Sequence, residues 1–214
     1  LVRSPVPMNI QLGKNVTQGL GAGGRPEVAR RAAEESVADL HTMLADNTKM
    51  VFITAGMGGG TGTGASPIVA KTAHDMGILT VGIVTIPFAF EGNVKIRQAL
   101  EGVVALSEYV DAILVINNEK LKNIFPDLNL SNAFAKADDV LTNAAKAIAE
   151  IITISGYINI DFADVSTIMR DGKVAIMNTG YASGDNRITR AIDDALTSPL
   201  LNTSDVKGAK KVLL

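Results

Sequence analysis

The chain of 214 residues contains no cysteine, no tryptophan and only two histidines. Without cysteine it can form neither disulfides nor thiolate metal sites, and this composition is compatible with a reducing cytoplasm. Apolar residues make up 47% of the chain and charged residues 20%, which is typical of a globular protein rather than a disordered one. This length allows one sizeable core, or a core and the start of a second domain.

The sequence also has no apolar segment long enough to span a membrane and no surface stripe of lysine and arginine. No segment approaches the roughly 20 apolar residues that cross a bilayer, and Leu1 to Pro5 do not resemble a secretory signal. The formal net charge is −2, without the Lys/Arg-rich face of a nucleic-acid binder. We therefore expect no membrane insertion and no nucleic-acid binding. Because the chain starts without methionine and ends in an apolar stretch, we expect both ends to be the edges of a fragment.

Apolar strands alternate with amphipathic helices along most of the chain. This alternation predicts an α/β fold in which a parallel, Rossmann-like sheet is covered on both faces. The expected strands are 50–55, 78–86 and 112–116, and the expected helices are 26–45, 65–76, 93–108 and a long central helix at about 131–154.

The central helix is predicted to begin at a capping residue, Ser131, and to bury one stripe of side chains. The stripe consists of Ala137, Val140, Leu141, Ala144, Ile148 and Ile151. After the helix the pattern changes, so we place a domain boundary near Gly156, which gives a first domain at 1–155 and the start of an α+β domain at 156–214. The second region is predicted to contain helices near 162–169 and 187–196 and strands at 174–177 and 212–214.

Glycines are concentrated between the first strand and the following helix. Such a loop can approach a ligand closely and aim its backbone N–H groups at phosphate, aided by the positive end of the helix. Thr61 and Thr63 can add hydroxyl donors. The alternative is a tight turn that binds nothing. The glycines are Gly58, Gly59, Gly60, Gly62 and Gly64.

Residues that are missing from the loop and from the next strand argue against two common classes of phosphate-binding site. Gly64-Ala65-Ser66 has no lysine, so the loop is not a Walker motif. A dinucleotide fingerprint fits as Gly60-x-Gly62-x-x-Ala65, which keeps a dinucleotide-dependent oxidoreductase as an alternative. That alternative needs an acidic residue at the end of the next strand, where the sequence has Thr85-Ile86-Pro87.

The glycine loop resembles the phosphate-binding loop of the tubulin superfamily, and the whole chain is similar to its bacterial cell-division members. Other motifs match in order and spacing. Gly19 to Gly23 with Pro26-Glu27 resembles the γ-phosphate-side loop, including Gly21, Ala22 and Gly23. Pro87 to Gly92 resembles the ribose-side loop, Asn159-x-Asp161-Phe162-Ala163-Asp164 the catalytic loop, and Ser198 to Leu201 the opening of the C-terminal domain.

The resemblance implies a GTPase domain and a role for each matching residue. Phe134 lies against the guanine ring, Asp138 accepts from its N1–H and amino group, and Asn118 is a further base contact. Glu91 holds the ribose. Residues four apart are neighbours on a helix, so the spacing of Phe134 and Asp138 is sensible. From the sequence alone, Phe134 could instead be a core residue and Asp138 an exposed acid on the helix surface.

Catalysis is assigned by the resemblance to Asn159, Asp161 and Asp164. In the family's filaments this loop enters the nucleotide site of the neighbouring subunit, where it positions and polarises the attacking water. The same acids also fit a plain helix cap, with Asp161 as the capping acceptor and Asp164 in the first turn. The two interpretations are compatible.

The family's biology follows as an expectation. The resemblance implies GTP or GDP with Mg²⁺ bridging the β- and γ-phosphates, without residues assigned as metal ligands. It implies head-to-tail filaments in the cytoplasm at the division site, and adaptors that bind a C-terminal tail beyond Leu214. A filament homologue that binds nucleotide without hydrolysing it remains an alternative.

Two departures from the family pattern qualify these roles. The family's upstream strand and its glycine-rich loop, which contacts the α- and β-phosphates, do not precede Leu1 in this sequence. The family often has arginine four residues after the ribose-side glutamate, where this chain has Lys95, with Arg97 nearby. Lysine keeps the charge but loses bidentate phosphate contact. His41 and His74 have no partners at metal-ligand spacing.

Overall fold

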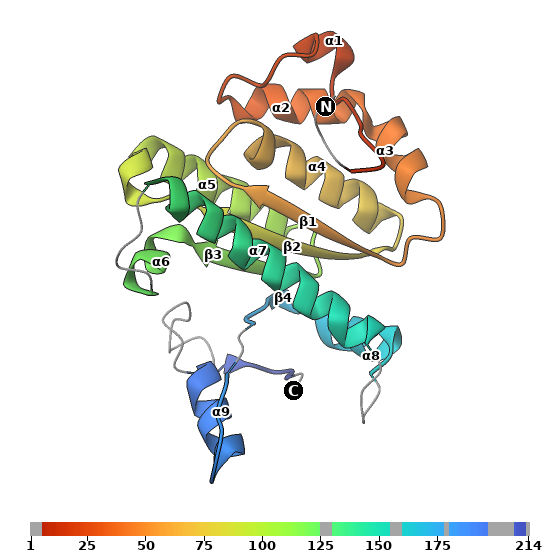
Figure 1. Cartoon of the computed structure of the whole chain (residues 1–214). Helices are drawn as coiled ribbons and strands as arrows, with labels where there is room; N and C mark the ends of the chain where they lie inside the picture. Colours follow the sequence, from red (N-terminus) through yellow and green to blue (C-terminus); the bar gives the residue numbers. More distant parts are fainter. Residues whose placement is uncertain (1–5, 125–129, 155–159, 178–179, 197–207, 213–214) are drawn as a thin grey trace.

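A parallel sheet forms the centre of the molecule (Figure 1). The computed structural model describes residues 6–124, 130–154, 160–177, 180–196 and 208–212. Within this part, the strand order is β1-β2-β3-β4 and every neighbouring pair is parallel, which confirms the predicted α/β fold. The strands are β1 Met50–Gly56, β2 Leu79–Ile86, β3 Ala112–Asn117 and β4 Lys173–Val174.

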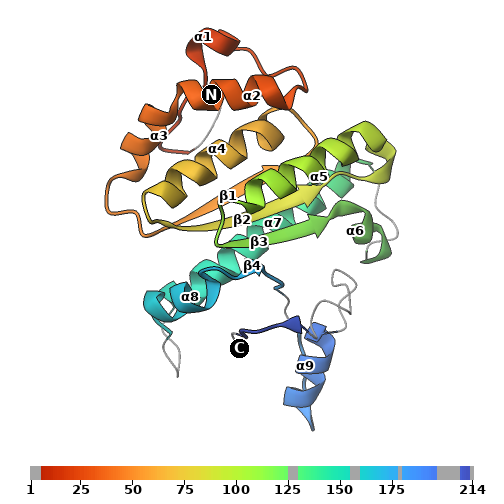
Figure 2. The ribbon, with the colours of Figure 1, turned by 180° about the vertical axis from the view of Figure 1, so that it is seen from behind.

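Helices cover both faces of this sheet (Figures 1 and 2). On one face lie α4 Thr61–Asp75 and α5 Asn93–Ser107, and on the other lies α7 Leu130–Thr153. Successive side chains of a strand point to opposite faces, so Val84 of β2 packs in the α4–α5 cluster while Val81 and Ile83 pack toward α7. The predicted stripe of α7 is confirmed, since Ala144 and Ile148 are buried against the sheet.

A second helical layer packs on α4. It consists of α1 Lys14–Thr17, α2 Pro26–Glu35 and α3 Val37–Leu44. The prediction of one helix over 26–45 is therefore wrong, because the helix is interrupted at Ser36. The buried Ser36 Oγ accepts a hydrogen bond from the Gly13 N–H (2.9 Å), while its own N–H donates to the Ala33 carbonyl (3.0 Å).

Other boundaries differ from expectation in smaller ways. Helix α4 begins at Thr61 instead of 65, so half of the glycine loop is its first turn. A short helix, α6 Asn118–Ile124, and a 3₁₀ turn, η1 Ala89–Glu91, were not predicted. Of the strand expected at 174–177, only Val174 lies in a strand, as the second residue of β4. Val212 is not in a strand, and Leu213 and Leu214 lie outside the described residues.

The region after the central helix contains α8 Phe162–Met169 and α9 Arg187–Leu196, both as predicted. Helix α8 lies near the C-terminal end of α7, and α9 lies apart from the layered part in both views (Figures 1 and 2). Strand β4 pairs with β3 and so extends the sheet.

The predicted boundary near Gly156 lies outside the described residues. In the part of the chain that the structure describes, no helix has the length and apolarity needed to span a bilayer.

Candidate functional site

The glycine-rich turn leaves the carboxyl end of β1 and enters α4. Gly58 has a φ of +96°, a conformation that a glycine adopts readily. Its buried N–H donates to the Thr63 Oγ1 at 2.8 Å, and Thr63 is only 5% exposed. Thr61, in contrast, is exposed at the first position of α4. Thr63 therefore organises the turn from inside, and Thr61 is the hydroxyl that faces solvent.

Most glycines of this turn are required by packing. A Cβ on Gly60 would meet the Ala22 Cβ at 2.9 Å and the Arg25 nitrogen at 3.0 Å. A Cβ on Gly64 would collide with the backbone carbonyl of Pro26, and one on Gly62 with that of Gly56. Only Gly59 of this run has open space, since no atom lies within 4 Å of the point that its Cβ would occupy. Gly59 and Thr61 are thus the positions open to a ligand.

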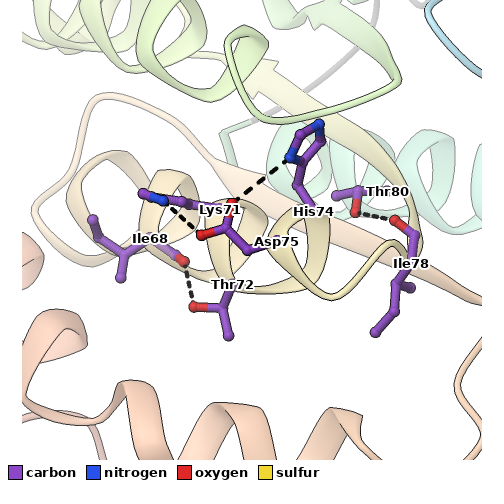
Figure 3. Close-up of polar contacts among 7 residues, drawn as sticks. All are labelled: Ile68, Lys71, Thr72, His74, Asp75, Ile78 and Thr80. Carbon is purple, nitrogen blue, oxygen red and sulfur yellow. Dashed lines mark hydrogen bonds and ion pairs between the residues drawn. The ribbon is translucent and has the colours of Figure 1, made fainter.

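A Thr63→Val substitution is expected to destabilise the chain by about 1–3 kcal/mol, because it leaves the buried Gly58 N–H without an acceptor. The matched control is Thr72→Val on the same helix. The Thr72 hydroxyl donates only to the Ile68 carbonyl one turn earlier (Figure 3), so its loss is expected to cost less than about 0.5 kcal/mol. Denaturant unfolding of both variants measures the difference, and equal losses would contradict an organising role for Thr63.

The loop predicted to face the γ-phosphate lies directly beside this turn. Ala22 is buried against Gly60, and the Arg25 N–H donates to the Ala22 carbonyl (3.1 Å). Gly21 and Gly23 are exposed, and Gly23 has a φ of +61°. Because Gly60 has no side chain, the loop around Ala22 can pack directly against the glycine turn, although the two segments lie about 40 residues apart in the sequence.

The predicted ribose-side turn, residues 87–92, reaches the same place. A Cβ on Gly58 would meet the Pro87 Cγ at 3.0 Å and the Lys95 carbonyl at 2.7 Å. Glu91 accepts from the Phe88 N–H (3.0 Å) and pairs with the Lys95 ammonium (3.2 Å). Of the two candidate cations, both exposed, Lys95 is the one paired with the predicted ribose ligand.

Aromatic rings gather next to this turn. The rings of Phe88 and Phe90 stack with centroids 5.0 Å apart, and Phe134 of α7 meets both edge-on at 5.6 and 6.2 Å. Phe134 is 43% exposed, so it is not the core residue that the alternative interpretation required. Asp138, one turn further along α7, is exposed and lines an open hollow between α7 and β1 with Phe52 and Thr54.

Asn118 carries the one unsatisfied buried side-chain atom among the described residues. It follows β3 directly, is 4% exposed, and its Oδ1 has no hydrogen-bond partner. A buried polar atom without a partner costs roughly 1–3 kcal/mol, so such atoms commonly await a ligand or a water. Asn118 lies at the carboxyl edge of the sheet, where open α/β sheets bind ligands.

Asp161 and Asp164 form a reciprocal cap at the start of α8. The Asp164 N–H donates to the Asp161 Oδ1 (2.9 Å), and the Asp161 N–H donates to an Asp164 carboxylate oxygen (3.3 Å). The capping interpretation is therefore confirmed. Both side chains are exposed, so the cap does not exclude a catalytic role. Asn159 lies outside the described residues.

These two acids are far from the glycine turn. They follow the C-terminal end of α7, whereas Phe134 lies near its start, and the 24 residues of α7 span about 36 Å. Figure 1 shows α8 at that distant end. The structure thus assembles the predicted phosphate, ribose and base contacts at one edge of the sheet and leaves the predicted catalytic acids at the other end of the molecule.

Comparisons with known proteins give the family of this chain. Residues 2–126 match the model of the Tubulin/FtsZ family, GTPase domain. The chain belongs to the tubulin/FtsZ family. Residues 173–214 match the FtsZ family, C-terminal domain, which leaves the predicted boundary between the two matched regions. Neither match supports the oxidoreductase alternative.

Relatives and solved structures give the same family. The chain is 61% identical over its full length to the cell division protein FtsZ of Porphyromonas gingivalis, covering 47% of that protein. It is 51% identical over 96% of its length to the FtsZ of Azotobacter vinelandii, covering 52% of it. A structure of an empty FtsZ dimer from M. jannaschii superposes with a TM-score of 0.88 at 45% identity, over 94% of this chain and 58% of that one. The chain thus spans about half the length of the curated relatives it matches.

The two histidines lie away from the site. His41 is exposed on α3, and the Nδ1 of His74 lies 3.9 Å from an Asp75 carboxylate oxygen at the far end of α4 (Figure 3). Asp75 also accepts from the Lys71 ammonium (2.6 Å), which lowers the pKa of that carboxyl. In the described ranges, no three His, Cys, Asp or Glu side chains gather as a metal site would require.

Proposed function

We propose that this chain is the guanine-nucleotide-binding part of a GTP-hydrolysing subunit that assembles head-to-tail into filaments for bacterial cell division. Family membership supports the reaction class, and the relatives are named cell division proteins. Because this chain spans about half the length of these relatives, hydrolysis and assembly are proposed for a protein of the relatives' full length.

The nucleotide fits the residues at the carboxyl edge of the sheet. Gly59 and Thr61 leave backbone and hydroxyl donors open toward phosphate at the start of α4. The unpartnered Asn118 Oδ1 can accept from the guanine, and Asp138 offers a carboxylate to the base's N1–H and amino donors. Phe134 supplies an exposed ring for stacking, and Glu91 is pre-positioned by the Phe88 N–H for the ribose.

Mg²⁺ would enter with the nucleotide. This cation keeps several waters and is usually held through substrate phosphates rather than by a protein cage. The donor set at the turn, with Thr61 exposed beside the expected phosphates, fits such a partial shell. Bound there, Mg²⁺ would neutralise charge on the β- and γ-phosphates.

The single observation that carries the filament proposal is the separation of two half-sites along α7. One half-site is the predicted nucleotide contacts at the carboxyl edge of the sheet, and the other is the predicted catalytic acids at the start of α8. Asp161 and Asp164 follow the far end of α7, a helix about 36 Å long, and so do not reach the nucleotide edge of their own chain. A neighbour stacked along the same axis would bring its acids, with Asn159, to this nucleotide, where they orient the attacking water. Such a heterologous contact repeats without closing and gives an open filament.

The cellular setting follows from the same proposal. Filaments of this kind would work in the cytoplasm at the division site, and adaptors would attach through a tail beyond Leu214. Neither insertion in a membrane nor nucleic-acid binding is part of the proposed function.

The test is GTP turnover per subunit as a function of protein concentration, on the full-length protein that includes the flanking segments of its relatives. We expect negligible turnover when dilute and a rise above a threshold, because a neighbour completes the site. Turnover independent of concentration would overturn the shared site. GTP binding and assembly without turnover would favour the non-hydrolysing alternative, and binding of NAD without GTP would favour the oxidoreductase.

A further inference from the structure

One carboxylate joins the ribose-side turn to the helix that follows β3. Glu119 is the second residue of α6, and one of its oxygens, Oε2, accepts from the Ala89 N–H at 2.8 Å. The other, Oε1, receives the Lys122 ammonium at 2.7 Å. Ala89 lies 30 residues earlier in the chain, so this hydrogen bond is a tertiary contact and not a local cap.

Both segments that Glu119 joins carry predicted nucleotide contacts. On one side, the turn holds Glu91, whose carboxylate is fixed by the Phe88 N–H. On the other side, Asn118 begins α6 with its unpartnered Oδ1. The Glu119 N–H is itself held by the Asn117 Oδ1 (3.0 Å), which anchors the start of the helix to β3. Glu119 therefore bridges the predicted ribose-side turn and the helix that begins with Asn118.

Lys122 extends this connection to the aromatic cluster. Its ammonium lies 5.3 Å from the centre of the Phe90 ring and 5.9 Å from that of Phe88. A cation over an aromatic face within about 6 Å is attracted by the ring. Phe90 and Phe88 in turn contact Phe134, so the Glu119–Lys122 pair is also in contact with the aromatic cluster.

We propose that Glu119 is a positioning residue, which ties the ribose-side turn 87–92 to α6 and so aligns Glu91 with Asn118. This inference rests on the proposed function, since the aligned groups are the predicted nucleotide contacts. An exposed ion pair alone contributes little, and the Glu119–Lys122 pair is about two-fifths exposed. The contact to the Ala89 N–H matters more, because a charged acceptor strengthens a hydrogen bond. Both partners lower the pKa of Glu119, Lys122 more than the Ala89 N–H, so the carboxylate form is favoured.

The test compares Glu119→Ala with Glu119→Gln in the full-length protein. We expect Glu119→Ala to weaken GDP binding about 5- to 20-fold, because the acceptor of the Ala89 N–H, which aligns two contacts, is lost. Glu119→Gln keeps an acceptor for the Ala89 N–H and is expected to stay within about 3-fold of the unmodified protein. The matched control is Glu34→Ala, which removes an exposed glutamate paired with Arg30 on the distant helix α2.

A second readout separates positioning from general destabilisation. The ratio of affinities for GTP and 2′,3′-dideoxy-GTP reports the ribose contact of Glu91, and we expect this ratio to fall toward one in Glu119→Ala. A variant that only unfolds more easily would lower the melting temperature and leave the ratio unchanged, which would overturn the inference. Unchanged affinity in Glu119→Ala would overturn it as well.

Failure of the proposed function gives a different result. An unmodified protein that binds no guanine nucleotide would remove the premise, whatever the variants do.

If Glu119→Ala does not fold, Glu119→Asp provides the same test, because its shorter side chain retains the charge but does not reach the Ala89 N–H. An intact affinity ratio in Glu119→Asp would then contradict the positioning role.

Discussion

Gly64→Ala is expected to destabilise the chain by about 2 kcal/mol, although alanine is the better helix former. In a helix, alanine is favoured over glycine by about 1 kcal/mol. At this position the new methyl would collide with the Pro26 carbonyl and lie 3.0 Å from the Ala29 Cβ. Overpacking of this kind costs about 1–3 kcal/mol, at the high end where the obstacle is backbone instead of a flexible side chain. The collision therefore outweighs the gain in helix propensity.

The matched control is Gly59→Ala in the same turn. No atom lies within 4 Å of the methyl it would introduce, so stability is expected to change by less than about 0.5 kcal/mol. Because Gly59 is open to the ligand, its methyl is expected instead to weaken nucleotide binding about tenfold. Denaturant unfolding and GDP binding of the two variants give opposite patterns. Equal destabilisation of both would show that packing against α2 does not explain the glycines.

This contrast also indicates the limit of interpreting a glycine run from sequence. The run predicted a phosphate loop, and it does lie at the carboxyl edge of a parallel sheet. The sequence could not distinguish Gly60 and Gly64, which admit Ala22, Arg25 and Pro26, from Gly59, which remains open, because these neighbours come from about 40 residues earlier. Packing partners that are distant in sequence leave no local signal.

The fold itself was largely predictable. Uniformly apolar strands alternating with amphipathic helices predicted the parallel sheet and the central helix correctly. The errors arose where a tertiary contact overrides a local pattern, as at Ser36, where the helical spacing continues but the side chain is used to bind Gly13. Helix α6 was missed because it is short and begins with two polar residues, of which Glu119 accepts a hydrogen bond from the distant Ala89 N–H.

The candidate site was predictable only in part. The adjacency of the segments at 19–25, 56–64 and 87–92 follows from the resemblance and agrees with the contacts at Gly58 and Gly60. The role of Glu119 had no sequence signal, since an acid followed three residues later by lysine is typical of any exposed helix. Its significance comes from the Ala89 N–H, which only the folded chain brings within reach.

Asp161→Asn is expected to reduce GTP turnover about 100-fold or more without lowering stability. Asparagine caps helices as well as aspartate does, so the hydrogen bond from the Asp164 N–H is preserved. What is lost is the negative charge that would polarise the attacking water, an effect worth about 10²- to 10⁴-fold in acid–base catalysis. The substitution thereby separates the confirmed capping role from the proposed catalytic one. Turnover of assembled full-length protein and its melting temperature are the measurements.

Two comparisons make this prediction decisive. Asp161→Ala removes both functions, so it is expected to lose turnover and also about 1 kcal/mol of stability. Asp39→Asn changes an acid in the first turn of α3, far from either half-site, and is expected to alter neither quantity. Filaments should still form in Asp161→Asn, because GTP binding uses the opposite edge of the molecule. Normal turnover in those filaments would mean that Asp161 only caps α8, and the shared-site mechanism would then have to rest on Asp164 and Asn159.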